Sequence, residues 1–247
     1  MLIGKESICF KKGLHYQSCE MDRIKIIGGN PLKGVIKISG SKNSALPILA
    51  ATLLTDKTFT LNNVPRLSDI FTMIKLLKSL NVKIDFKKNI LLSKSDKPKS
   101  LVASYDLVRR MRASFLILGP LLARYGNAEV SMPGGCAIGQ RPVDLHLFAL
   151  KKLGAKIKIK NGYIIAEAKN GLKGTNITFP NVSVGATENA VLAAFHANGK
   201  TILNNCAIEP EVKDLIKFLN KLGGKITILG RKILITECKK IKKNINH

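Results

Sequence analysis

Cys136 lies in a segment whose composition suits chemistry on a bound ligand. Residues 131–146 read Ser-Met-Pro-Gly-Gly-Cys-Ala-Ile-Gly-Gln-Arg-Pro-Val-Asp-Leu-His, so the thiol is surrounded by glycines. Glycine permits backbone conformations closed to other residues and adds little bulk, so a substrate can approach the backbone. Arg141 follows shortly after, and Arg112 lies upstream. A thiol near fixed cations serves as a nucleophile or proton donor. The alternative is a free cysteine in a flexible turn.

The composition argues against several other classes of protein. The five cysteines form no CxxC pair, which disfavours a disulfide framework and a zinc ribbon, and the four scattered histidines suggest no metal site. The longest apolar run, from Phe115 to Ala123, is too short to cross a bilayer, and the first twenty residues lack a secretory apolar segment. We therefore expect a cytoplasmic protein with no cofactor, no metal and no membrane partner.

The net charge of +25 has two explanations. The first is nucleic-acid binding. Against it, aromatic residues make up only 5% of the chain, and no stacking platform or zinc finger is present. The second is compositional bias, because Lys, Ile and Asn are all abundant, as an AT-rich genome produces. We favour bias and expect no nucleic-acid partner; an anionic small substrate suits the charge under either explanation.

The two ends of the chain differ from its centre. Residues 1–20 show no clear periodicity, so we predict a mis-assigned start or a disordered leader. Residues 21–40 predict two strands around the turn Gly28-Gly29-Asn30-Pro31. Residues 237–247 are predicted to be a basic tail.

An internal repeat organises residues 41–236. Each copy has a short polar segment, an apolar helix, a strand, a loop with an Asp, an amphipathic helix and a hairpin. The copies span about 41–95, 105–168 and 182–236. The amphipathic helices end in Leu80-Asn81, Leu153-Gly154 and Leu222-Gly223, and glycine or asparagine suits a helix C-cap. The sequence therefore predicts one α/β domain of three β-α-β-α-β-β repeats.

The apolar helices are predicted over 45–54, 115–123 and 190–197. They are apolar on nearly all sides, so each should be buried all round. If they run parallel, their polar N-termini converge, and the helix dipoles together with Lys42 and Arg112 form a site for a phosphate-bearing ligand. The alternative is ordinary helix capping, which we favour for Ser41 and Thr187 taken alone.

Four segments occur in a recognisable order and spacing. They are Ser-Gly-Ser-Lys-Asn-Ser-Ala-Leu-Pro from Ser39, Met-Arg-Ala-Ser from Met111, Pro-Gly-Gly-Cys-Ala-Ile-Gly-Gln-Arg-Pro-Val-Asp-Leu-His from Pro133, and Ser-Val-Gly-Ala-Thr-Glu-Asn from Ser183. Together they closely resemble the enolpyruvyl transferase family of UDP-N-acetylglucosamine 1-carboxyvinyltransferases, over about residues 21–236. The resemblance implies an inside-out α/β barrel. It also implies transfer of the enolpyruvyl group of phosphoenolpyruvate to the 3-hydroxyl of UDP-N-acetylglucosamine, with release of phosphate, early in peptidoglycan synthesis.

The resemblance also assigns roles to individual residues. Cys136 would be the catalytic proton donor, would hold phosphoenolpyruvate as a covalent adduct, and would be alkylated by fosfomycin. Lys42 and Asn43 would contact phosphoenolpyruvate. The UDP-N-acetylglucosamine contacts would be Arg112, Arg141, Pro142, Val143, Asp144, Leu145, Ser183 and Val184. These roles agree with physical chemistry, because both substrates are polyanions and a cation at a helix start binds phosphate well. For Asp144 we favour helix N-capping as its main role, shared with Asp69 and Asp214 of the other copies.

The chain departs from the family pattern in two ways. Asn181 stands where some members have a lysine. Family members also run to over 400 residues in two domains, with the active site between them, whereas this chain has 247 residues. The strands at 21–40 would belong to the second domain, which would also supply the aspartate base and further arginines.

Three functional hypotheses follow from this departure. The leading one is the N-terminal half of an enolpyruvyl transferase, either a split enzyme whose second domain is carried by a separate chain or a frame-interrupted enzyme. The second is a non-catalytic remnant that only binds a UDP-sugar. The third is a basic nucleic-acid-binding protein.

Overall fold

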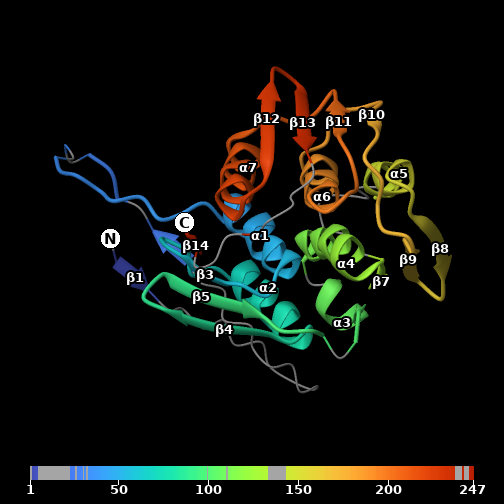
Figure 1. Ribbon diagram of the computed structural model, residues 1–247. Coiled ribbons are helices and arrows are strands. Elements are labelled where there is room, and N and C mark those ends of the chain that lie inside the picture. The colour runs from blue at the N-terminus through green and yellow to red at the C-terminus, as the bar shows by residue number, and fades with distance from the viewer. Residues whose placement is uncertain are drawn as a thin grey trace, which may run out of the picture. The chain divides into compact units, whose positions relative to one another are not determined.

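A computed structural model describes residues 2–4, 23–25, 27–29, 31, 33–98, 100–109, 111–132, 143–236, 241 and 245–247 (Figure 1). The chain divides into two compact units, Met1–Ile38 and Ser39–His247.

Among its described residues, the first unit contains one pair of strands. Strand β1 (Leu2–Gly4) runs antiparallel to strand β2 (Arg23–Lys25). Residues 2–4 of the stretch predicted to be a disordered leader are therefore a strand. The second strand predicted within 21–40 is absent, because described residues 33–38 form neither helix nor strand. Val35, Ile36 and Ile38 there are largely exposed, so their alternation is not used to cover a core.

The described residues of the second unit form three four-stranded sheets, with strand orders β14-β3-β5-β4, β6-β7-β9-β8 and β10-β11-β13-β12. The strands are β3 (Thr58–Leu61), β4 (Val82–Lys87), β5 (Ile90–Ser95), β6 (Val102–Ala103), β7 (Asn127–Ser131), β8 (Lys156–Lys160), β9 (Tyr163–Glu167), β10 (Asn176–Thr178), β11 (Thr201–Asn204), β12 (Lys225–Leu229), β13 (Lys232–Thr236) and β14 (Ile245–Asn246). In each sheet one edge strand is parallel to its neighbour, and the other pairs are antiparallel.

Each copy of the repeat supplies one sheet, but the first copy takes its edge strand from far away. The edge strands β6 and β10 precede the buried helices of the second and third copies and lie just before the predicted starts of those copies, at 105 and 182. The first sheet is completed by β14, which pairs Ile245 with Phe59. The stretch 237–247, predicted to be a basic tail, thus contains a strand of the domain in its described residues. The three predicted hairpins, β4-β5, β8-β9 and β12-β13, are confirmed.

Three apolar helices fill the centre, as predicted. They are α1 (Lys42–Ala51), extended by the 3-10 helix η1 (Thr52–Leu54), then α4 (Leu118–Tyr125), preceded by the 3-10 helix η2 (Arg112–Ile117), and α6 (Val184–Ala194). Seven residues of α1, from Ala45 to Ala51, are buried, and so are nine of α6, from Ala186 to Ala194. In Figure 1 the sheets lie outside these helices, which is the inside-out α/β arrangement.

The second apolar helix is divided where a single helix was predicted. Residues 112–117 wind as a 3-10 helix, and the α-helix begins only at Leu118. Pro120 lies in the first turn of this α-helix, where its missing N–H group is tolerated. The helix then ends at Gly126, which adopts the left-handed conformation with φ of 72°.

Amphipathic helices α2 (Ser68–Ser79), α5 (Asp144–Lys152) and α7 (Pro210–Leu222) pack beside the buried ones, and a short helix α3 (Tyr105–Val108) precedes the second copy. The predicted C-terminal ends of these three amphipathic helices are confirmed. Asn81, Gly154 and Gly223 have positive φ values of 64°, 96° and 113°. Left-handed residues of this kind end helices while satisfying their last carbonyls.

The N-cap prediction for the three aspartates is wrong. The N-cap positions are Leu67, Val143 and Glu209, so Asp69, Asp144 and Asp214 all lie inside their helices. Asp144 is the first residue of α5, where a carboxylate still favours the positive end of the helix dipole. Helix α7 starts earlier than predicted because Pro210 suits a first helical position.

Candidate functional site

The N-termini of the three buried helices open onto one cavity, as the sequence predicted. The cavity has a volume of about 690 Å³. Its walls come from the first turns of α1, η2 and α6, together with parts of α2, α5 and α7. The lining residues are Lys42, Asn43, Leu46, Pro47, Asp69, Met111, Arg112, Ala113, Phe115, Leu116, His146, Ser183, Val184, Gly185, Glu188 and Glu211.

Two of the three helix starts are capped by serine. Ser41 Oγ accepts a hydrogen bond from the Ser44 amide, and Ser183 Oγ accepts one from the Ala186 amide, both at 3.3 Å. The capping alternative is therefore confirmed for Ser41, whereas Thr187 lies within α6 and accepts from the Ala207 amide at 3.1 Å. Each serine satisfies one N–H group, which leaves the first amides of the helix available to a ligand oxygen.

Lys42 lies in the cavity as part of an ion pair. Its Nζ is 2.7 Å from Oδ2 of Asp69, and the two side chains are 42% and 32% exposed. The pair holds the ammonium group at the start of α1 without removing it from solvent. An anionic ligand in this position competes with, or joins, the Asp69 carboxylate.

A buried hydrogen-bond chain links the second and third copies behind the start of α6. The Gly119 amide donates to Asn189 Oδ1 at 2.8 Å, and Asn189 Nδ2 lies 3.1 Å from His146 Nδ1. The His146 ring packs edge-on against Phe115 at 5.2 Å. Burial lowers the pKa of His146 to about 3, and the nearby Arg112 guanidinium adds to this shift. The imidazole is therefore neutral at physiological pH.

Glu188 is the second buried titratable group at this site. Burial raises its pKa to about 8, with smaller contributions from the carboxylates of Glu211 and Glu209. At neutral pH the side chain is mostly a neutral acid that can donate a hydrogen bond. Two titratable side chains are thus both neutral beside the start of α6.

Five of the predicted site residues come together in this cavity: Lys42, Asn43, Arg112, Ser183 and Val184. Val143, Asp144 and Leu145 lie at the start of α5 and are not part of its described lining. Cys136, Arg141 and Pro142 fall outside the described residues, so their roles stay predictions.

The sequence interpretation missed His146 and Glu188 as site residues and Asp69 as the partner of Lys42. One signal was available for Glu188, because Glu188-Asn189 is a polar pair inside an otherwise apolar helix. His146 carried no comparable signal, since its orientation depends on residues of two other helices.

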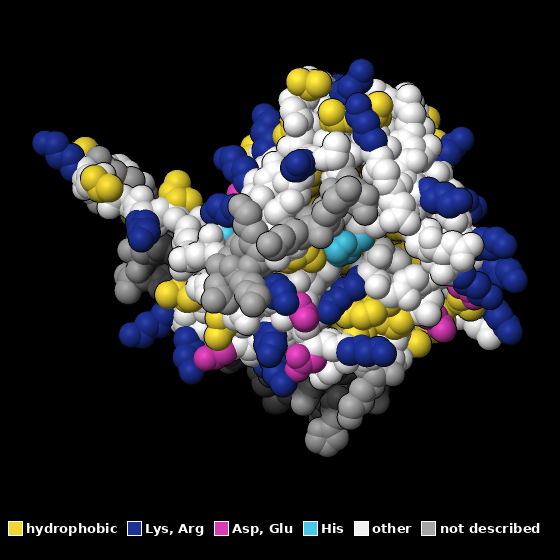
Figure 2. All heavy atoms as spheres, viewed as in Figure 1, with side chains coloured by type: hydrophobic (Ala, Val, Ile, Leu, Met, Phe, Trp, Pro, Cys, Tyr) yellow, Lys and Arg dark blue, Asp and Glu magenta, His cyan; other side chains and the backbone are white. Residues whose placement is uncertain are grey.

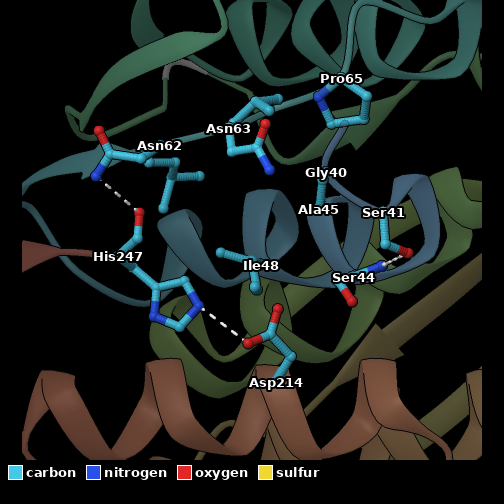
Figure 3. A pocket seen from close by; sticks show the side chains of 12 residues that line it. Gly40, Ser41, Ser44, Ala45, Ile48, Asn62, Asn63, Pro65, Asp214 and His247 are labelled. Carbon is cyan, nitrogen blue, oxygen red and sulfur yellow. Dashed lines mark hydrogen bonds and ion pairs between the residues drawn. The ribbon is translucent and has the colours of Figure 1, made fainter. Parts of the chain in front are cut away.

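A second cavity of about 250 Å³ lies beside the other face of the α1 start (Figure 3). His247 and Asp214 face each other there, with 3.3 Å between Nε2 and Oδ1. The backbone N–H group of Asn62 donates a hydrogen bond to the His247 carbonyl oxygen at 2.7 Å. Its lining contains none of the predicted site residues within the described chain, so we place the candidate site in the larger cavity.

Figure 2 shows Lys and Arg side chains scattered over the visible face, without one continuous block. None of the helices in the described residues is long and apolar enough to cross a membrane.

The fold and the cavity define a domain of the enolpyruvyl transferase type. A sequence profile of the EPSP synthase (3-phosphoshikimate 1-carboxyvinyltransferase) family matches residues 26–247, and the chain belongs to this family. Solved structures agree on the fold. The enolpyruvyl transferase NikO from Streptomyces tendae superposes with a TM-score of 0.77 at 19% identity, covering 89% of this chain and 52% of that one. An EPSP synthase from Acinetobacter baumannii superposes with a TM-score of 0.70 at 17% identity, covering 86% of this chain and 48% of that one.

The sequence relatives are more specific. The chain is 59% identical over 203 residues to the UDP-N-acetylglucosamine 1-carboxyvinyltransferase of Pelagibacter ubique, covering 82% of this chain and 49% of the relative. It is 56% identical over 212 residues to the enzyme of the same name from Endomicrobium trichonymphae, covering 86% and 51%. The chain therefore spans about half the length of these relatives.

Proposed function

We propose that this chain is the half of a UDP-N-acetylglucosamine 1-carboxyvinyltransferase that binds both substrates at the converging helix N-termini. The observation that carries the proposal is the cavity itself, where Lys42, Asn43, Arg112, Ser183 and Val184 meet. Helix N-termini with added cations are suited to phosphate groups, and both UDP-N-acetylglucosamine and phosphoenolpyruvate carry them. The resemblance at 50–59% identity supports this choice of substrates.

We assign the roles in the reaction from the family resemblance. Arg112, with Ser183 and Val184, holds the diphosphate of the UDP-sugar, and Arg141, Pro142, Val143, Asp144 and Leu145 contribute further contacts to it. Lys42 and Asn43 bind phosphoenolpyruvate. Cys136 protonates the methylene carbon of phosphoenolpyruvate, because addition of the sugar hydroxyl requires an acid at that carbon. The reaction belongs to peptidoglycan synthesis in the cytoplasm.

Turnover requires a second domain, supplied by a further segment or a partner chain. The chain spans about half of each relative. The domain described above runs from Ser39 to His247, and we assign the stretch before it to the second domain. The chain by itself is expected to bind UDP-N-acetylglucosamine without releasing phosphate from phosphoenolpyruvate.

Binding and complementation test the proposal in order. Calorimetry with UDP-N-acetylglucosamine should show binding that Arg112→Ala weakens about tenfold or more, the size expected for one charge-assisted contact to phosphate. Addition of the other half of the Pelagibacter ubique relative should restore phosphate release. Fosfomycin should add to the wild-type thiol, detected by mass spectrometry. Cys136→Ser is the matched control for this reaction.

The outcomes separate the hypotheses. No binding of the UDP-sugar rejects the proposed function. Binding without activity in the reconstituted pair favours a remnant that only binds the nucleotide sugar, a hypothesis that the half-length match also supports.

A further inference from the structure

The side-chain amide of Asn189 has one defined orientation. A backbone N–H needs an oxygen acceptor, so the Gly119 amide at 2.8 Å must face Oδ1. The NH2 group then points the other way, toward Phe115 O at 3.5 Å and His146 Nδ1 at 3.1 Å. Asn189 is fully buried, and a Cβ on Gly119 would lie 2.3 Å from Oδ1, so this close contact depends on glycine.

The Asn189 amide decides which nitrogen of His146 carries the proton. An NH2 group only donates, so Nδ1 must accept, and the single proton of the neutral ring lies on Nε2. The ring has little freedom to turn, since it is 6% exposed and packs against Phe115. The low pKa of His146 agrees with a ring that stays neutral.

The protonated nitrogen faces the first turn of α6. A Cβ added to Gly185 would lie 3.2 Å from His146 Nε2, so this edge of the ring lies directly against the glycine. Ser183, Val184, Gly185 and His146 all line the cavity. The Ala186 amide is taken by the Ser183 hydroxyl, and the amides of Val184 and Gly185 precede any intrahelical partner. The N–H groups of Val184 and Gly185 and the Nε2–H group of His146 are therefore hydrogen-bond donors at the same place, the N-terminus of α6.

We propose that Asn189 holds His146 as the neutral Nε2–H tautomer, so that the imidazole donates a hydrogen bond to a phosphate oxygen bound at the N-terminus of α6. The identity of the nucleotide rests on the proposed function, but the donor and its tautomer do not. A neutral donor suits this buried position, because a charged imidazolium would lose its hydration beside Arg112. Asn189 acts through His146 and is a positioning residue.

The first experiment reads the tautomer in the whole chain. In a sample labelled with ¹⁵N-histidine, long-range proton–nitrogen spectra distinguish a ring nitrogen with a proton from one without. His146→Gln identifies the signal of this ring. We expect the proton on Nε2 in the wild type, and the Nδ1–H or doubly protonated form in Asn189→Asp, whose carboxylate accepts from Nδ1. A wild-type ring with its proton on Nδ1 overturns the proposal.

The second experiment tests the donor with inorganic pyrophosphate as the probe. We expect the His146 Nε2 signal to shift on titration. His146→Phe, which keeps an aromatic ring against Phe115, should weaken binding about tenfold or more, whereas His146→Gln, which places an NH2 group near the Nε2 position, should remain within about threefold. His247→Gln in the other cavity is the matched control and should bind as the wild type does. Unfolding midpoints confirm that each variant folds.

The result for pyrophosphate separates this inference from the proposed function. Pyrophosphate binding that depends on His146, without binding of the UDP-sugar, rejects the substrate but keeps the donor. A His146 signal that does not respond to pyrophosphate, or equal affinities for the wild type and His146→Phe, rejects the donor role.

Discussion

The N-termini of α1 and α6 line the same cavity, but they offer a ligand different chemical groups. Both are capped by serine with a 3.3 Å hydrogen bond to the amide three residues on. The start of α1 is partly exposed and carries an ion pair, Lys42 with Asp69. The start of α6 is more deeply placed, and the titratable groups beside it, His146 and Glu188, are buried and neutral.

This difference shows how burial selects the chemistry of an anion site. Water screens the charges of the Lys42–Asp69 pair and keeps the ammonium group hydrated. Beside α6 an unpaired charge would lose its hydration, so burial shifts both pKa values toward the neutral forms. Both sites are helix N-termini. The N-terminus of α1 therefore adds a fully charged ammonium group, whereas the N-terminus of α6 adds neutral hydrogen-bond donors.

The largest effect is expected from removing the close contact behind α6. In Gly119→Ala, the new methyl group would lie 2.3 Å from Asn189 Oδ1 and 2.6 Å from the backbone carbonyl oxygen of Asn189. Overpacking together with a lost buried hydrogen bond should lower the free energy of unfolding by about 3 kcal/mol, measured by urea denaturation. Gly28→Ala, where nothing lies within 4 Å of the new Cβ, should change little. Equal stabilities of the two variants would contradict the tight approach of α4 and α6.

The next effect depends on pH and on Glu188. In the folded protein Glu188 keeps its proton up to about pH 8, whereas the unfolded chain loses it near 4.5. The folded state binds more protons in this window, so the stabilising contribution is complete below pH 4.5 and is lost as pH rises toward 8. Glu188→Gln removes this dependence.

Urea denaturation of both proteins at pH 5 and pH 8 measures that effect. Relative to Glu188→Gln, the wild type should lose on the order of 2 kcal/mol between the two values. The opposite contribution of His146, which is lost toward acid, is common to both proteins and cancels. Parallel pH profiles would show that Glu188 titrates normally.

A smaller effect is expected at the exposed end. Lys42→Ala should weaken phosphoenolpyruvate binding about fivefold to tenfold, because one screened charge is removed. Asp69→Asn should strengthen it by a few fold, since Lys42 then has no carboxylate at 2.7 Å to compete with the ligand. Calorimetry at two salt concentrations measures both. A loss of affinity in Asp69→Asn would mean that Asp69 positions the lysine instead of competing for it.

The smallest effect compares the two caps directly. Ser41→Ala and Ser183→Ala should each lower the free energy of unfolding by about 1 kcal/mol, the usual loss for a serine N-cap. The Ser183 variant should also weaken pyrophosphate binding more, because its amides share the ligand with His146. Thermal unfolding and titration of both variants give the comparison. A greater loss of pyrophosphate affinity in Ser41→Ala than in Ser183→Ala would contradict the comparison.

The elements that follow local rules could be predicted from the sequence. The hairpins were visible as alternating residues, and Asn81, Gly154 and Gly223 marked helix ends because their positive φ values suit asparagine and glycine. The edge strands β6, β10 and β14 were missed, because two or three residues are too few to show a period of two. The N-cap prediction for Asp214 failed because Pro210 starts the helix a full turn earlier.

The site was predictable only where it depends on one helix start. Lys42, Arg112 and Ser183 open their helices, so the convergence of those helices brought them together. The role of His146 depends on Asn189, 43 residues away, and on Gly119 in a third helix. Contacts of this kind arise from packing between copies, which no pattern within one copy reports.

Strand β14 affects the order in which the domain can form during synthesis. The sheets of the second and third copies close with partners nearby, such as Asn204 and Thr178, 26 residues apart. The first sheet closes through Asn62 and Asn246, 184 residues apart. A chain emerges from the ribosome N-terminus first, and closing a longer loop costs more entropy. The copy that is made first is therefore the last whose sheet can be completed, and the edge of β3 stays open until the rest of the domain has been made.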